Sequence, residues 1–146
     1  MPITVKTFMQ SGLKAKIDNY YAPNVIAFLV NDSGGTLTNA STMVDVSALE
    51  LPSGNGYARQ LVTLPTASII GGNAESQSDD IVFQASGGNI PTFSHICFVV
   101  GGNTTVGDSS GVIDRVEPVN NNSPISLQDG ESYIHSYLHR ETGNYV

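Results

Sequence analysis

Three residues near the C-terminus carry side chains that bind transition metals. Glu131, His135 and His139 follow one another at intervals of four. On an α-helix this spacing would place a carboxylate and two imidazoles on one face, where they could hold a zinc ion. On a β-strand, Tyr133, His135, Tyr137 and His139 would share one face instead. The tyrosine-rich composition favours the strand. We therefore expect an exposed row of tyrosine and histidine that contacts protein, and no metal.

A glycine-containing segment, Gly54-Asn55-Gly56-Tyr57-Ala58-Arg59, shares two glycines with the pattern that binds dinucleotides. The third glycine of that pattern is replaced by Arg59. The segment also precedes an expected strand, so no helix N-terminus could receive a pyrophosphate. We expect no cofactor here.

Other reactive side chains have no arrangement that suits catalysis. Asp79 and Asp80 are adjacent, and neighbouring residues of an extended chain point to opposite faces, which prevents joint action on a cation or a glycosidic bond. Cys97 is the single cysteine, so an intrachain disulfide is impossible, and it lies in the apolar run Ser94–Val100. A buried core thiol is expected there. No Gly-x-Ser-x-Gly motif is present. We expect a protein that is not an enzyme.

Composition excludes two classes of partner. The 146 residues include 6 basic and 13 acidic side chains, for a net charge of -7. So few cations cannot follow a phosphate backbone or an anionic membrane surface. No apolar run approaches the roughly 20 residues that span a bilayer. Met1–Val5 does not have the pattern of a signal peptide, so synthesis in a host cytoplasm is expected.

Turn-forming residues divide most of the chain into short extended segments. We expect one domain over residues 1–146, with an N-terminal helical segment at 1–22 and an all-β, antiparallel sandwich or jelly roll at 25–146. Apolar residues at helical spacing predict one amphipathic helix over residues 7–20. The segment Gly72–Ser78 is expected to be a polar loop. The expected strands are Val25–Val30, Thr42–Val46, Tyr57–Leu64, Asp80–Gln84, Phe93–Val100, Val112–Val116, Ser123–Leu127 and Ser132–Leu138.

Several short motifs resemble those of a family of small virion structural proteins of tailed bacteriophages. They are Gly54-Asn55-Gly56-Tyr57-Ala58-Arg59, then Asp80-Ile81-Val82-Phe83, then Thr92–Phe98 with its histidine, and Asp129-Gly130 before the last strand. Their order is similar from about residue 25 to the C-terminus. Members often have a tryptophan where this chain has Ile90-Pro91. The resemblance implies a β-sandwich on the virus particle, oligomeric and often trimeric, without catalysis.

The function expected from this resemblance is that of a capsid decoration or cement protein. It would bind the major capsid protein at the outer shell and bridge neighbouring subunits through apolar and aromatic surface. The alternative is a tail-fibre, tail-tip or adaptor module that binds a host glycan. For Leu13 and Ile17, ordinary core packing is an equally good interpretation. The candidate contact residues are Phe8, Met9, Leu13, Ile17, Tyr20, Tyr21, Tyr133, His135, Tyr137 and Tyr145.

Overall fold

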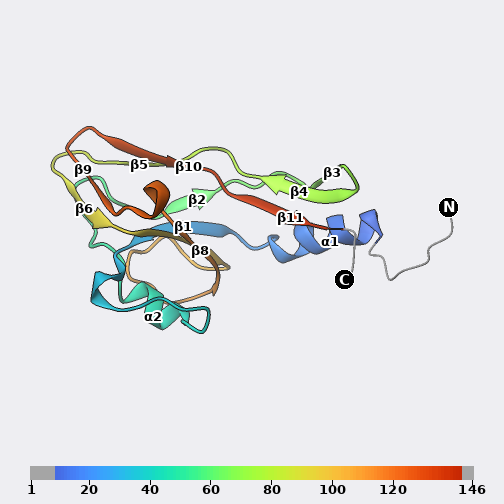
Figure 1. Ribbon diagram of the computed structural model, residues 1–146, viewed down its shortest axis with the longest axis horizontal. Coiled ribbons are helices and arrows are strands. Elements are labelled where there is room, and N and C mark those ends of the chain that lie inside the picture. Colours follow the sequence, from blue (N-terminus) through green and yellow to red (C-terminus); the bar gives the residue numbers. More distant parts are fainter. Residues whose placement is uncertain (1–8, 143–146) are drawn as a thin grey trace. The chain divides into compact units, whose positions relative to one another are not determined.

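The protein is mostly β, with antiparallel sheets and one N-terminal helix, in a computed structural model that describes residues 9–142 (Figure 1). No helix within these residues is long and apolar enough to cross a membrane. The helices are α1 (Gln10–Tyr20) and α2 (Met43–Ser47), with short 3-10 turns at Asp32–Gly34 and Asn120–Asn122. The strands are β1 (Val25–Val30), β2 (Gln60–Val62), β3 (Ser68–Ile70), β4 (Asn73–Gln77), β5 (Ile81–Gln84), β6 (Ile90–Phe93), β7 (His95–Val100), β8 (Val112–Pro118), β9 (Ile125–Leu127), β10 (Ser132–His135) and β11 (Leu138–Glu141).

The chain divides into two compact units. Unit 1 combines the residues up to Pro23 with Thr63–Asp79 and the residues from Ser136 onward, and unit 2 combines Asn24–Val62 with Asp80–His135. Each unit therefore draws its elements from distant parts of the sequence. The single domain expected over residues 1–146 stays a prediction.

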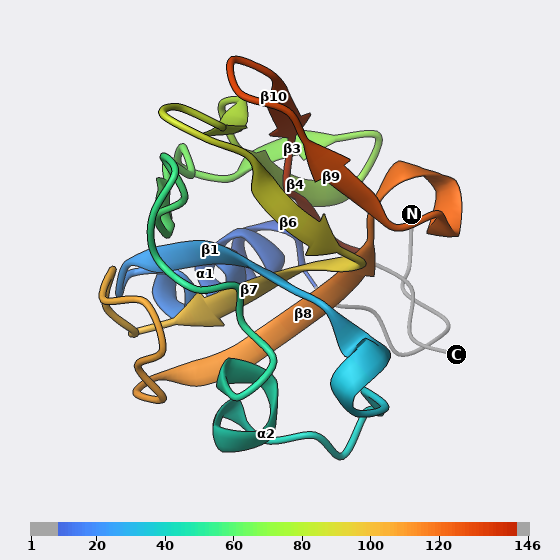
Figure 2. The ribbon, with the colours of Figure 1, turned by 90° about the vertical axis from the view of Figure 1, so that its left-hand side faces the viewer.

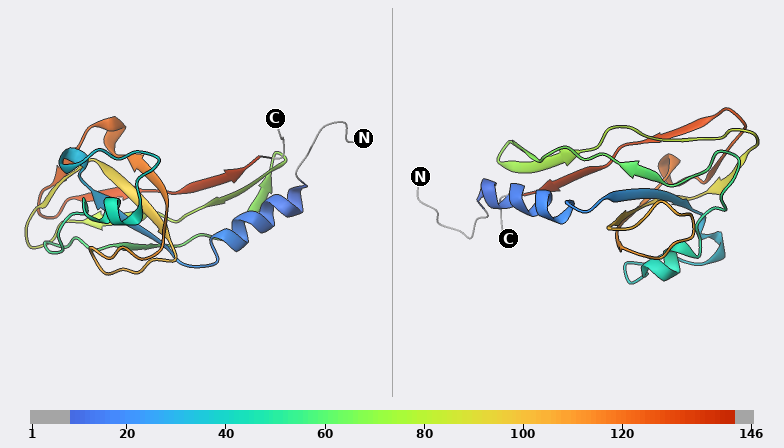
Figure 3. Two further views of the ribbon diagram at one scale, coloured as in Figure 1. Left: turned by 90° about the horizontal axis from the view of Figure 1, so that it is seen from below. Right: turned by 180° about the vertical axis from the view of Figure 1, so that it is seen from behind.

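Unit 1 packs α1 against a three-stranded antiparallel sheet of order β11-β4-β3 (Figure 3). Leu13 and Ile17, one helical turn apart, are buried against Ala67 and Ala74. A Lys14–Asp18 ion pair of 2.8 Å supports the outer face at the favourable i,i+4 spacing. The predicted helix is confirmed over residues 10–20, while residues 7 and 8 lie outside the described part.

The largest sheet of unit 2 has four antiparallel strands in the order β2-β1-β7-β8. Figure 2 shows β1, β7 and β8 side by side. All six residues of β1 are buried, because both faces of this central strand are covered. One face buries Ile26, Phe28 and Cys97 beneath α2. On the other, the ring of Phe98 lies 5.9 Å from that of His135 in β10. The core of unit 2 therefore lies on both sides of this sheet.

The predicted strand at Thr42–Val46 is wrong, because this segment forms α2. Thr42 caps the helix: its Oγ1 accepts from the N–H of Asp45, and the Asp45 carboxylate accepts from the N–H of Thr42. This capping box satisfies backbone donors that a strand would need to pair elsewhere. Met43 and Val46 then face the core at a helical spacing. The expectation that no helix follows the N-terminal one is also wrong.

Two other predictions are corrected by the sheets. The expected strand Ser132–Leu138 is interrupted, because β10 pairs with β5 whereas β11 pairs with β4. The expected polar loop at residues 72–78 contains β4, the central strand of the unit 1 sheet. The side chains of β4 are mostly polar, which is why the sequence predicted a loop. They alternate in burial along the strand, and Ala74 and Ser76 are buried.

Candidate functional site

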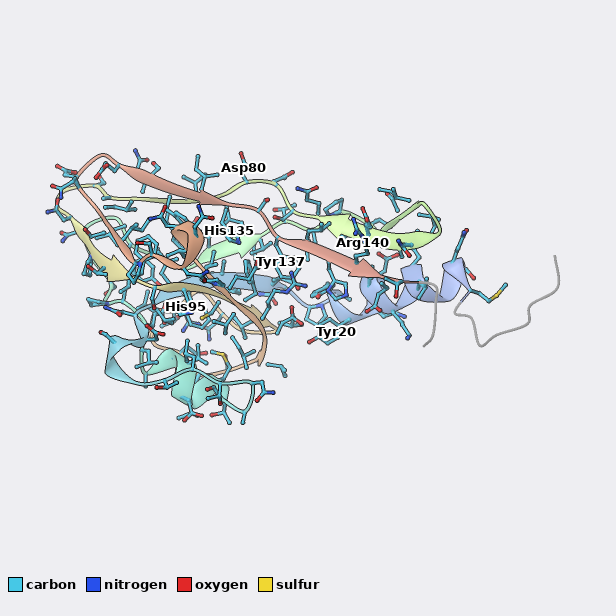
Figure 4. The ribbon with its side chains drawn as sticks, viewed as in Figure 1. Tyr20, Asp80, His95, His135, Tyr137 and Arg140 are labelled. Carbon is cyan, nitrogen blue, oxygen red and sulfur yellow. The ribbon has the colours of Figure 1, made fainter. Side chains whose placement is uncertain are left out.

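The predicted N-terminal contact residues separate into buried and exposed groups. Leu13 and Ile17 are 0% and 2% exposed, so they belong to the core of unit 1 and cannot contact a partner in this state. Met9 and Tyr20 are exposed at 61% and 47% (Figure 4 marks Tyr20). Tyr21 is half-buried. Phe8, like Tyr145 at the other end, lies outside the described residues.

The predicted exposed row of tyrosine and histidine points inward. Tyr133 and His135 are half-buried and Tyr137 is completely buried, whereas Ile134 and Leu138 are exposed. Figure 4 marks His135 and Tyr137. The alternation of faces was predicted correctly. The prediction that the tyrosine and histidine side chains face solvent was wrong, because the aliphatic side chains do. The aromatic rings are the larger apolar surfaces, and their polar ends find hydrogen bonds within each unit.

In unit 1 these polar ends form a hydrogen-bonded chain. The Tyr21 hydroxyl lies 2.6 Å from the Tyr137 hydroxyl and 2.8 Å from Nδ1 of His139. On its other side, Nε2 of His139 lies 3.1 Å from a carboxylate oxygen of Glu141. Such a chain fixes the orientation of the imidazole, as in acid–base catalysis. Here it includes the completely buried Tyr137, so we interpret it as polar packing between α1 and β11.

In unit 2 a second cluster surrounds His135. Its Nδ1 lies 2.9 Å from the Tyr133 hydroxyl, and its Nε2 lies 3.6 Å from Oε1 of Glu117. Burial raises the pKa of Tyr133, and the Glu117 charge raises it further. The other oxygen of Glu117, Oε2, is shielded from solvent and has no hydrogen-bond partner among residues 9–142. Nη1 of Arg115 lies 3.9 Å from this oxygen, at ion-pair distance.

The candidate metal ligands have other partners. Glu131 accepts a hydrogen bond of 2.6 Å from the N–H of Gln128 in a turn. His135 and His139 belong to the separate clusters described above. Across residues 9–142, no group of three or more histidine, cysteine, aspartate or glutamate side chains is arranged to hold a metal ion. Asp79 and Asp80 are both exposed.

A buried ion pair that we did not predict explains the segment ending in Arg59. The side chains of Arg59 and Glu50 are 0% and 1% exposed, and Nη2 of Arg59 lies 2.6 Å from Oε1 of Glu50. The guanidinium also donates to the carbonyls of Asn103 and Asp108. The Tyr57 hydroxyl donates to Glu50 at 2.7 Å. This segment therefore holds a long loop against the sheet.

A groove of about 470 Å³ lies beside β8 in unit 2. Its apolar lining includes Leu37, Val46, Ile113 and Val116, and its polar lining includes His95. β8 is also the last strand of its sheet among the described residues. The groove therefore lies beside the last strand of this sheet in residues 9–142.

Exposed apolar side chains also gather on the outer face of the β5–β10 pair. Val82 and Ile134 are direct cross-strand partners and are 42% and 57% exposed. Directly opposed side chains on one sheet face contact each other, so these two form a continuous apolar surface. In unit 1, Ile69 and Ile70 of β3 are also exposed.

No family model, curated protein or solved structure matches this chain. The resemblance to virion proteins of tailed phages therefore stays a prediction.

Proposed function

We propose that this chain is a structural component of a tailed-bacteriophage particle, a decoration or cement protein that binds the major capsid protein and bridges its subunits. The motifs in Gly54–Arg59, Asp80–Phe83 and Thr92–Phe98 support this assignment by their order. We also propose that the antiparallel sheets of unit 2 form a sandwich. The ring contacts of Phe98 with His135, and of Tyr57 with Phe83 at 6.2 Å, support that arrangement.

The observation that carries the proposal is the exposed Val82–Ile134 pair. An apolar surface on a sheet face is a common feature of sites that bind other proteins. Burial of both side chains against a capsid subunit would remove apolar area from water, at about 25 cal/mol per Å². The binding free energy gained per copy is small, but a shell component binds at many equivalent positions. A homo-oligomer, such as a trimer, would increase the total binding free energy further, because several copies bind together.

The test uses the phage that encodes this chain. Quantitative mass spectrometry of purified particles should find hundreds of copies if the protein covers the shell, because a capsid repeats its subunits on that scale. A few tens of copies would place it in the tail, with glycan binding as the function to test next. Absence from the particle would refute the assignment.

A pair of variants tests the surface itself. The double variant Val82→Ser/Ile134→Ser should bind the particle more weakly, because it removes the apolar surface and leaves the buried faces of β5 and β10 intact. Val44→Ser is the matched control, since Val44 is equally apolar and 66% exposed but lies on α2. Equal loss in both variants, measured as copies retained per particle, would contradict a role for this surface.

A further inference from the structure

An asparagine followed by a glycine lies in an exposed turn of unit 2. Asn55-Gly56 is the one such pair in the sequence, since every other asparagine precedes a residue with a side chain. Asn55 has a φ of 53° and Gly56 has a φ of 84°, so the backbone is left-handed at both positions. Both residues are exposed, which gives water access to the peptide bond that joins them.

This pair can convert asparagine to aspartate without an enzyme. The backbone nitrogen of Gly56 attacks Cγ of Asn55, so that an N–Cγ bond forms, the Cγ–Nδ2 bond breaks, and ammonia leaves with the proton of the peptide N–H. Water then opens the cyclic succinimide at either of its carbonyls and yields aspartate or isoaspartate. Glycine at the second position favours the attack, because it has no side chain to hinder the approach and adopts the required backbone angles freely.

Three contacts restrain this reaction in the folded chain. Nδ2 of Asn55 donates to the carbonyl of Asn89 at 2.9 Å. The carbonyl of Asn55 accepts from the N–H of Ser86 at 2.9 Å, which fixes the plane of the peptide that contains the attacking nitrogen. The carboxamide also packs on Gly88, where an added Cβ would lie 2.6 Å from Oδ1 of Asn55. Ring closure requires the carboxamide to move and the peptide to rotate, so it disrupts both hydrogen bonds.

We propose that Asn55 is a deamidation site whose rate is set by the docking of its turn on residues 86–89. The folded chain holds this asparagine in an unreactive geometry, and release of the turn lets the reaction proceed. Each net hydrogen bond changes an equilibrium by roughly fivefold, so deamidation should be at least about tenfold slower in the folded chain than in the unfolded one. This inference is independent of the proposed function.

The product would weaken the contacts that restrain its formation. An aspartate carboxylate cannot donate to the carbonyl of Asn89, and it places a negative charge beside that oxygen. Isoaspartate adds a methylene group to the main chain, inside the turn that the N–H of Tyr57 closes by donating to the carbonyl of Gly54. Each event also adds one negative charge to a chain whose net charge is -7. Deamidation should therefore release the turn irreversibly.

Timed incubation of the full-length protein in mildly alkaline buffer, with and without urea, tests the proposal. Peptide mapping by mass spectrometry locates each reacted asparagine, and enzymatic methylation identifies isoaspartate. In urea, Asn55 should react faster than any other asparagine. In the folded protein its rate should fall at least about tenfold. Equal rates with and without urea, or a faster reaction at another asparagine in urea, would overturn the proposal.

Two glycine variants separate docking from backbone strain. Gly88→Ala places a Cβ against the carboxamide of Asn55, which must shift away from Asn89, so deamidation of the folded variant should accelerate several-fold. Gly87→Ala is the matched control, because both glycines have positive φ but a Cβ at position 87 would meet nothing within 4 Å. In urea, where the turn is lost, both variants should react at the wild-type rate.

Two results with these variants would also contradict control by docking. One is equal acceleration by the two alanines in the folded protein, which would assign the effect to strain. The other is a folded Gly88→Ala variant, verified by circular dichroism, that reacts no faster than wild type. The comparison of wild-type rates with and without urea decides the proposal even where a variant does not fold.

Discussion

Replacing Arg59 with methionine should strongly destabilise the protein. Methionine keeps an unbranched apolar side chain over the ring of Phe28, where the guanidinium carbon now lies 4.5 Å from the centroid. The substitution removes the charge that faces Glu50, whose side chain is 1% exposed. The carboxylate would retain hydrogen bonds only from the Tyr57 hydroxyl and the N–H of Gly107 among those described.

The magnitude follows from the cost of a buried charge without its counter-ion. Removing one partner of a buried ion pair typically costs about 3–5 kcal/mol. Two retained donors offset part of this cost at Glu50, but the carbonyls of Asn103 and Asp108 also lose their charged donor. We therefore expect a loss of about 4 kcal/mol, or a decrease in Tm of roughly 8–16 °C for a chain of this size.

Chemical denaturation of matched variants measures this loss. Lys14→Met is the control. The Lys14 side chain is 38% exposed, and its ion pair with Asp18 should contribute about 0.3–0.5 kcal/mol to the free energy of unfolding. Adding Glu50→Leu to Arg59→Met removes the stranded charge, so the double variant should be more stable than Arg59→Met alone. Equal losses for Arg59→Met and Lys14→Met, or simple additivity in the double variant, would refute the reasoning.

Three further outcomes are expected. Burial raises the pKa of the Cys97 thiol, so a maleimide at pH 8 should label the unfolded protein but not the native one, as measured by mass spectrometry. The Asp18 carboxylate accepts a hydrogen bond from the N–H of Ala67, which lowers the pKa of Asp18 in the folded state. The stabilisation from this carboxylate is complete above the unfolded pKa of about 3.9 and is lost as pH falls through the lower folded pKa. Asp18→Asn should therefore make stability depend less on pH in acid denaturation monitored by circular dichroism. Gly56→Ala should lower the free energy of unfolding in urea at least twice as much as the control Gly107→Ala, for which ~1 kcal/mol is expected. Both glycines have positive φ, but only at position 56 would a Cβ lie 2.5 Å from a backbone oxygen.

The elements that could be predicted are those whose periodicity and boundaries agree. α1 follows the spacing of Leu13 and Ile17, and Pro23 lies just beyond its end. β1 is a continuous apolar run that ends in a turn cluster at Asn31, as a fully covered strand should. In these segments local preference and tertiary packing favour the same structure.

The elements that could not be predicted are those in which two local signals compete. In α2 the β-branched Val44 and Val46 favour a strand, but the Thr42–Asp45 capping box and the burial of Met43 with Val46 favour a helix. In β4 the central position of the strand decides the structure, since the neighbours of Asn73–Gln77 supply the hydrogen bonds that its polar composition does not predict. Such long-range pairing leaves no pattern within the segment itself.

The site was mispredicted for a different reason, which changes where partners can bind. A segment with aromatic residues at odd positions and Ile134 and Leu138 at even positions is apolar on both faces, so alternation alone cannot say which face is covered. Hydroxyl and imidazole groups decide it here, because Tyr133 with His135, and Tyr137 with Tyr21, satisfy one another inside their units. The outer face is then left aliphatic. A partner that covers this face gains by burial alone, so binding through Val82 and Ile134 should depend little on salt.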